Sequence, residues 1–340
     1  MDRDYFVDDM RVIDEINEVV KQIPLMRRVK FYKIRKNPLE ELQEAEFKIK
    51  YRFSRGTTVF PIDMMKNDLA GDSRGGFIPP HPNVLTAIRT WARGEIQDDA
   101  GDLSGMSQPT ISLVCKQVAL ALVAQRAKWI KMPQSDVERN HVIAGFYSVC
   151  GFRLLIAYIF ESRKQIHYNL LNLLFHINKA MSTLFQVVSN ANLEIVDIVA
   201  HWRGTTHDSR IFDESRIKQR FEQSEFKGRL LGDFGYVCTP YLFTPNTQKK
   251  EMYNRSHIKI RNTVERCFGV WKQRFRCLQL ELNTKLVNTK VYIVALAILH
   301  NIAMYKQDAV EDNGNVPVTE LVNNSLRGNS VRAAFINENF

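Results

Sequence analysis

The segment "LEIVDIVAHW", residues 193–202, decides the fold class of this 340-residue chain. Its alternation and its β-branched residues predict a strand. The short apolar run "GRLLGDFGY", residues 228–236, predicts a second strand that ends at Asp233. Between them, "HDSRIFDESRIKQRF" predicts a helix, with Asp208 and Ser209 as N-cap candidates. Strand, helix and strand in this order are the pattern of an α/β domain.

The sequence predicts mostly helices on both sides of this segment. Residues 71–82, "GDSRGGFIPPHP", concentrate Gly and Pro and predict a loop. Apolar residues at helical spacing predict helices from residue 83 to about residue 131, and another helix over residues 286–304. After a polar stretch, "VRAAFINENF" at the end of the chain predicts a short helix that packs back. We therefore divide the chain into a helical region (1–130), an α/β domain (131–306) and a tail (307–340).

The charge of the chain favours a polyanionic partner. Lys and Arg number 47 and Asp and Glu number 37, so the formal charge is 47 − 37 = +10, and the pI is about 9.3. Such an excess suits nucleic acid or an acidic membrane surface. Five scattered cysteines with no C-x-x-C pair predict neither a zinc site nor a disulfide framework, which favours a reducing compartment.

Targeting and membrane signals are weak. The first residues, "MDRDYFVDDM", are acidic and contain no apolar core of a signal peptide. The longest apolar run, "VYIVALAIL" at 291–299, has nine residues, whereas a bilayer needs roughly 20. We expect a soluble, intracellular protein with no membrane span.

Two acids stand where catalytic metal ligands are common. Asp233 ends a predicted strand, the place at which α/β sheets hold their ligands, and Glu265 lies 32 residues later in the helical run "NTVERCFGVWKQRF" at 262–275. Carboxylates that converge can hold a pair of Mg²⁺ or Mn²⁺ ions, which serve phosphodiester chemistry. From the residues alone, a surface ion pair of Glu265 with Arg261 is the favoured alternative, because the two are spaced i,i+4.

Further candidates surround these acids. Asp208 in "HWRGTTHDSRIF" is either a helix N-cap, worth ~1 kcal/mol, or a third metal ligand, and the cap is favoured. His207 could bind a phosphate or simply pack. The cations on the helix with Glu265 would face a DNA backbone: Arg261, Arg266, Lys272 and Arg274.

The run "GDLSGMSQPTISLVCKQV", residues 101–118, predicts a helix-turn-helix near 95–124. Ser107 is the expected N-cap of the second helix, and Pro109 is tolerated in its first turn. In such motifs the N-terminal residues of the second helix reach the bases, here Gln108, Thr110 and Ser112. An ordinary αα-hairpin is the more common cause of the pattern.

Five segments in this order resemble one family. "GDLSGMSQPTIS", "DIVAHWRGTTHDSRIF", "RLLGDFGY", "NTVERCFGVWKQRFRCL" and "AILHNIA" are similar to segments of PIF/Harbinger transposases, and equally to the host-domesticated nuclease derived from them. The resemblance extends from about Arg35 to Phe340.

The resemblance implies an α/β RNase H-like DDE nuclease domain preceded by an all-α region with a helix-turn-helix. It makes Asp233 the second and Glu265 the third acid of a metal site for Mg²⁺ or Mn²⁺, and it places Asp208 near that site. It further implies DNA as substrate, a Myb-like DNA-binding protein as partner, and the nucleus as location, with the cytoplasm as a second location. It leaves open whether the chain forms an oligomer.

The first acid of the family is missing. In "GFRLLIAYIFESRK", residues 151–164, alignment places Phe160 at its position, and the Thr-His that should follow is absent. Glu161 is adjacent, but successive strand residues point to opposite faces, so it would need a bulge to serve. The family pattern is lost over residues 153–185, where "YNLLNLLFHINKAMSTLF" favours a helix. We therefore expect impaired cleavage, with a catalytically inactive nuclear DNA-binding protein as the alternative.

Overall fold

The computed structural model describes residues 37–71, 78–94, 105–150, 158–164, 183–203, 208–226, 228–245, 251–280, 284–309 and 326–339. The chain divides into two compact units, Met1–Arg35 and Lys36–Phe340. Every described residue belongs to the second unit. Predictions on residues 72–77, 95–104, 165–182 and 204–207 therefore fall outside the described residues, and these include His207 and the first part of the predicted helix-turn-helix.

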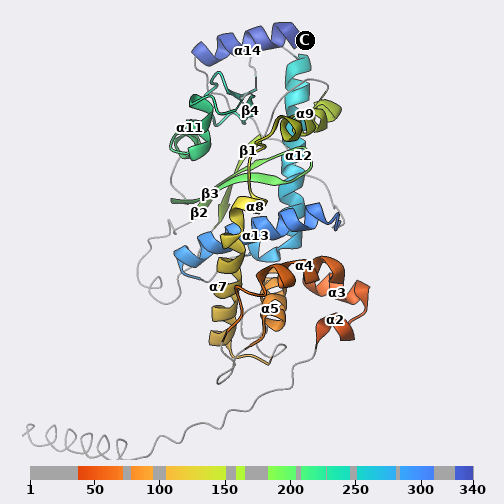
Figure 1. The fold of residues 1–340 in the computed structure, drawn as a ribbon. Helices are drawn as coiled ribbons and strands as arrows, with labels where there is room; N and C mark the ends of the chain where they lie inside the picture. Colours follow the sequence, from red (N-terminus) through yellow and green to blue (C-terminus); the bar gives the residue numbers. More distant parts are fainter. Residues whose placement is uncertain are drawn as a thin grey trace, which may run out of the picture. The chain divides into compact units, whose positions relative to one another are not determined.

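A mixed sheet of five strands forms the α/β part of the fold (Figure 1). Its strands are β1 (Tyr158–Lys164), β2 (Thr183–Ser189), β3 (Ile195–Arg203), β4 (Leu230–Leu231) and β5 (Leu242–Phe243), in the order β3-β2-β1-β4-β5. The first three strands pair antiparallel, while β4 and β5 run parallel to β1 and to each other. Both strands expected around the central helix are confirmed, although the second has two residues and stops before Asp233.

Two other expectations need correction. The run favoured as a helix up to Phe185 is wrong at its end, because Thr183–Phe185 begin β2. The single helix expected after residue 207 is two helices, α10 (Asp208–Asp213) and α11 (Arg216–Glu222). Ser215 explains the break: its hydroxyl donates to the Phe212 carbonyl at 2.6 Å and accepts from the Lys218 amide at 3.3 Å. One side chain thus ends the first helix and caps the second.

The N-terminal region is all helical where it is described. Its helices are α2 (Pro38–Glu41), α3 (Glu44–Tyr51), α4 (Arg55–Met65), α5 (Pro80–Arg93), α7 (Gln108–Ala124), α8 (Arg126–Trp129) and α9 (Asp136–Cys150). Gly94 ends α5 with φ of 64°, and a Cβ there would lie 2.6 Å from Leu280 Cδ1. Only glycine meets both demands, so this C-cap is a tight junction between α5 and the segment after α12.

The C-terminal helices complete the core. They are α12 (Glu251–Arg274), the 3₁₀ turn η1 (Arg276–Leu278), α13 (Leu286–Tyr305) and α14 (Leu326–Asn339). Phe185 of β2 lies 5.6 Å from Trp271 of α12, ring centroid to centroid, within a cluster that also includes residues of α5, α7 and α13. The helix α13 is long and apolar enough to cross a membrane, yet 67% of that stretch is buried in the fold, as in the core helix of a globular protein.

The motif "AILHNIA" holds the edge strand β3. The Asn301 side chain accepts from the Ile195 amide at 2.8 Å and donates to the Ile195 carbonyl at 2.7 Å and to the Trp129 carbonyl at 2.7 Å. His300 Nε2 donates to the Leu193 carbonyl at 2.7 Å, and burial lowers the pKa of His300 to about 4. These buried bonds satisfy main-chain groups that an edge strand would otherwise leave unpaired.

Candidate functional site

Asp233 lies two residues beyond β4 in a tight turn. Its carboxylate is half-buried and accepts the Gly235 amide at 2.9 Å. Gly232 precedes it, and a Cβ at that position would lie 3.0 Å from the Tyr236 ring and 3.2 Å from Leu242. The close packing at Gly232 fixes where the chain leaves the strand, and so where the carboxylate stands.

A polar stripe on α12 runs beside this turn. His257, Arg261 and Glu265 are spaced i, i+4, i+8 and therefore share one face of the helix. The buried ring of His257 hydrogen bonds to the main chain of Gly232 and Phe243, and burial lowers its pKa to about 4. The contact with Gly232 brings the stripe next to the peptide that precedes Asp233. The predictions missed His257, although its spacing from Glu265 could have identified it.

Glu265 is paired within this stripe. Its Oε1 accepts from Arg261 Nε at 2.9 Å, and the two side chains are 10% and 18% exposed. The i,i+4 pairing that we favoured from the residues alone is confirmed, but the pair is largely buried instead of lying on the surface. Burial makes each partner depend on the other, since a lone charge there would be poorly solvated.

The described residues do not assemble the expected metal ligands. Among them, no group of three or more His, Cys, Asp or Glu side chains could hold a metal ion. Asp233 is engaged by an amide and Glu265 by a guanidinium group. Asp208 begins α10, but its side chain lies outside the described part of the chain. The described side chains alone therefore do not form a complete two-metal centre.

The register of β1 gives the faces of positions 160 and 161, where the first acid was expected. Phe160 pairs with Val187 of β2, and Glu161 pairs with Gln186. Val187 is buried in the cluster that contains Val264 of α12, whereas Gln186 donates to the Tyr236 hydroxyl at 3.0 Å in the other direction. Because paired residues share a face, position 160 belongs to the face on which α12 packs, and position 161 belongs to the opposite face.

The predicted DNA-contacting cations of α12 divide into three classes. Arg266 is exposed, and two further cations, Arg255 and Lys259, are exposed on the same helix. Lys272 is half-buried, its ammonium lies 5.8 Å from the Phe268 ring, and burial lowers its pKa. Arg274 has an exposed fraction of 0%.

The DNA contact expected of Arg274 is therefore wrong for this fold. Its Nη1 donates to the Arg52 carbonyl at 2.6 Å, its Nη2 donates to the Asp308 carbonyl, and its guanidinium lies 4.7 Å from the Phe53 ring. The physical reason is position: residue 274 ends α12 on the face that meets the N-terminal helices.

The second helix of the predicted helix-turn-helix is present as α7. Ser107 is its N-cap, with its hydroxyl 2.8 Å from that of Thr110. Gln108 is exposed, while Thr110 and Ser112 are half-buried. Farther along, Leu113 is 55% exposed and Leu120 is 47% exposed, so the outer face is partly apolar. The base contacts of Gln108, Thr110 and Ser112 stay predictions.

Known proteins match the chain over most of its length. Residues 167–301 match the family described as DDE superfamily endonuclease. The protein "Putative nuclease HARBI1" of Homo sapiens is 24% identical over 277 residues, which cover 78% of this chain and 79% of the relative. The chain is a relative of the Harbinger transposase-derived nucleases. The Xenopus laevis protein of the same name is 24% identical over 81% of the chain and 83% of its own length.

A plant relative is more distant, and no solved structure matches. "Protein ALP1-like" of Arabidopsis thaliana is 21% identical over 78% of this chain and 72% of its own length. DDE endonucleases generally use divalent metal ions, and a nuclease domain implies a nucleic acid substrate. The family match begins at residue 167, so β1 and Phe160 lie outside it.

Proposed function

We propose that this chain is a nuclear DNA-binding protein, derived from a Harbinger-type nuclease, whose metal-dependent DNA cleavage is impaired. The observation that carries the proposal is the register of β1, in which position 160 pairs with Val187, a residue buried in the same cluster as Val264 of α12. An apolar residue there offers no oxygen to a hard cation. Glu161 belongs to the other face and does not replace the missing ligand.

The two remaining acids support the same proposal. Asp233 and Glu265 come from adjoining elements, linked through His257, but each already has a partner within the protein. A Mg²⁺ ion prefers near-ideal octahedral geometry and retains waters when few carboxylates are available. Two carboxylates that must first release their partners would hold such an ion weakly.

Binding to DNA does not require a complete metal site, because exposed cations can contact the phosphates. Arg255, Lys259 and Arg266 are exposed along α12, and the chain carries a formal charge of +10. Neutralised phosphates release counterions, so affinity for duplex DNA should fall linearly with salt on a logarithmic scale. The helix-turn-helix, an RNase H-like class for the sheet, and a Myb-like partner belong to this proposal as further expectations from the family.

The test measures binding and cleavage of one labelled duplex by the full chain, with Mg²⁺ or Mn²⁺ present. We expect salt-sensitive binding and no cleavage above the level of the Asp233→Asn, Glu265→Gln double variant. Arg266→Ala should reduce the salt slope by about 0.9, because one phosphate contact is lost. Arg210→Ala, an exposed arginine of α10 that pairs with Glu214 at 3.0 Å, is the matched control and should leave the slope unchanged.

A restoration variant makes the proposal sharper. Phe160→Asp returns a carboxylate to the α12 face, and metal-dependent cleavage in this variant alone would support the assignment of position 160. Its thermal unfolding must be recorded beside the assay, since a charge in a central strand costs stability. Cleavage by the unaltered chain that disappears in the double variant would show that the nuclease is intact and would overturn the impairment.

A further inference from the structure

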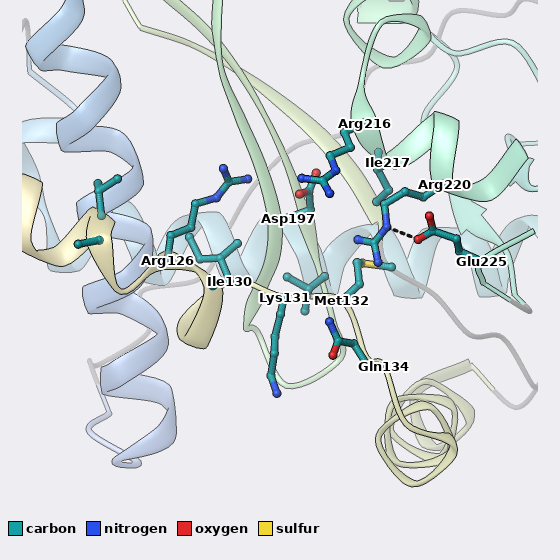
Figure 2. A pocket seen from close by; sticks show the side chains of 14 residues that line it. Arg126, Ile130, Lys131, Met132, Gln134, Asp197, Arg216, Ile217, Arg220 and Glu225 are labelled. Atoms are coloured by element: carbon teal, nitrogen blue, oxygen red, sulfur yellow. Dashed lines mark hydrogen bonds and ion pairs between the residues drawn. The ribbon is translucent and has the colours of Figure 1, made fainter. Parts of the chain in front are cut away.

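A partly open pocket lies at the edge strand β3, away from Asp233 and Glu265. It has a volume of about 530 Å³ and is lined by the end of α7, α8 and the segment after it, by β3, and by α11 (Figure 2). In the sheet order β3-β2-β1-β4-β5, two strands separate β3 from β4, which leads to Asp233. None of the residues assigned to the metal site or to the α12 cations lines this pocket.

Three arginines and Asp197 line the pocket. The guanidinium groups of Arg126 and Arg216 are turned toward Asp197 (Figure 2). Among the described residues, neither guanidinium group has an ion pair within 4.0 Å, and both act electrostatically on Asp197. The third guanidinium, of Arg220, is held by Glu225 at 2.6 Å and lies 4.3 Å from the Phe226 ring.

Asp197 is the acceptor of the pocket. Burial raises the pKa of its carboxyl, while Arg126, Arg220 and Arg216 act in the opposite direction. Its carboxylate accepts a hydrogen bond from the Ile198 amide. A carboxylate has about four lone-pair sites, so this bond uses only part of its acceptor capacity. Asp197 lines the pocket, so a ligand there would meet its carboxylate.

Apolar side chains form one wall of the pocket, and Lys131, Gln134 and Glu225 complete its lining. The apolar wall consists of Ile130, Met132, Val196 and Ile217. The amide of Gln134 also lines the pocket (Figure 2). A site with an apolar wall, convergent guanidinium groups and one fixed acceptor suits a ligand with a flat ring, an anion and an N–H donor. A nucleotide carries all three, whereas a free phosphate uses only the arginines and is repelled by Asp197.

We propose that this pocket binds one unpaired nucleotide of a DNA strand, with its phosphate on Arg126 and Arg216 and its exocyclic amine on Asp197. The inference rests on the proposed DNA-binding function and names a contact for a single strand. Carboxylate side chains accept from cytosine N4, and thymine presents a carbonyl oxygen at the equivalent position. The site should therefore prefer cytosine to thymine.

The experiment titrates the full chain with labelled single-stranded octamers of deoxycytidine or of thymidine. Wild type should bind the cytosine octamer about fivefold or more tightly, as expected for one good base contact. Asp197→Asn should abolish this preference, because an amide both donates and accepts. Arg126→Ala and Arg216→Ala should weaken both octamers several-fold, and the preference should survive. Arg210→Ala is the control for charge, and thermal unfolding excludes misfolded variants; Arg126→Lys serves if the alanine variant is unstable.

Every outcome decides the proposal. Equal binding of both octamers by wild type, or no effect of the Arg126 and Arg216 variants, overturns it. Competition by a poly-glutamate peptide as strong as competition by deoxycytidine monophosphate also overturns it, because the pocket would then be a site for acidic peptides. If duplex binding persists in these cases, the proposed function stands while the pocket assignment fails; if wild type binds no DNA at all, the proposed function itself fails.

Discussion

The middle and the end of α12 use positive charge in opposite ways. In the middle, Arg261 pairs with Glu265 beside the turn of Asp233, while Arg266 faces outward. At the end, Arg274 is buried and joins the main chain of Arg52 to that of Asp308. Glu265, Arg266 and Arg274 lie in one family-like segment, residues 262–278, so the motif combines groups for a polar site with groups that hold the fold. The role of each arginine therefore depends on the face and the part of α12 on which it lies, and the residue type is the same in both roles.

The largest expected effect is at the buried end. Arg274→Met removes a charge that two buried carbonyls require, and a broken buried network of this kind costs about 3–5 kcal/mol. Urea unfolding should show a large fall in the midpoint. Arg266→Ala, from the exposed part of the same helix, should change stability by less than about 0.5 kcal/mol. Equal effects of the two variants would remove the distinction between the two regions.

A smaller effect should follow acidification. Burial lowers the pKa of His300 to about 4, below the value of about 6.5 in an unfolded chain. Below pH 6.5 the unfolded chain therefore binds more protons than the folded chain. The contribution of His300 is complete above about pH 6.5 and is lost as pH falls toward 4, by about 1.4 kcal/mol per pH unit.

Thermal unfolding between pH 7 and pH 5 measures this slope. His300→Gln keeps a donor for the Leu193 carbonyl but removes the titration, so the slope should become shallower by about one proton. An unchanged slope in the variant would mean that His300 is already protonated in the fold, contrary to its burial.

The smallest expected effect is at the polar stripe. Glu265→Gln leaves a neutral acceptor for Arg261 in this largely buried pair, so the loss should be about 1.5 kcal/mol, the value of a hydrogen bond to a charged group. A double-mutant cycle with Arg261→Gln would isolate the coupling between the two side chains. A loss as large as that of Arg274→Met would place Glu265 among the groups that hold the fold, and its assignment to a site would lose its support.

Local patterns predicted much of the architecture. The strand at 193–202, the helix around Glu265, the helix at 286–304 and the terminal helix are all present, because each has a strong period or a clear run of β-branched residues. The break at Ser215 and the strand start at Thr183 were missed. Both depend on one side chain or one pairing partner, which a periodic pattern does not contain.

The site was predictable only in part. The sequence located Asp233 after a strand and Glu265 on a helix, and the i,i+4 spacing predicted the bond to Arg261. It could not show that His257 touches Gly232, nor that Asp197 stands among Arg126, Arg216 and Arg220, since these residues are far apart in the chain.

By itself, the sequence determined the resemblance to the Harbinger family, the α/β and helical composition and the net charge, and it predicted the loss of an acid at position 160, because motifs, periods and charges are local properties. Tertiary structure alone decided that Arg274 is buried, that positions 160 and 161 belong to opposite faces in register with Val187 and Gln186, and that an arginine pocket forms at β3. These three features depend on which elements, distant in the sequence, pack together. The free energies of burial and of strand pairing determine that packing, and they arise only when the chain folds.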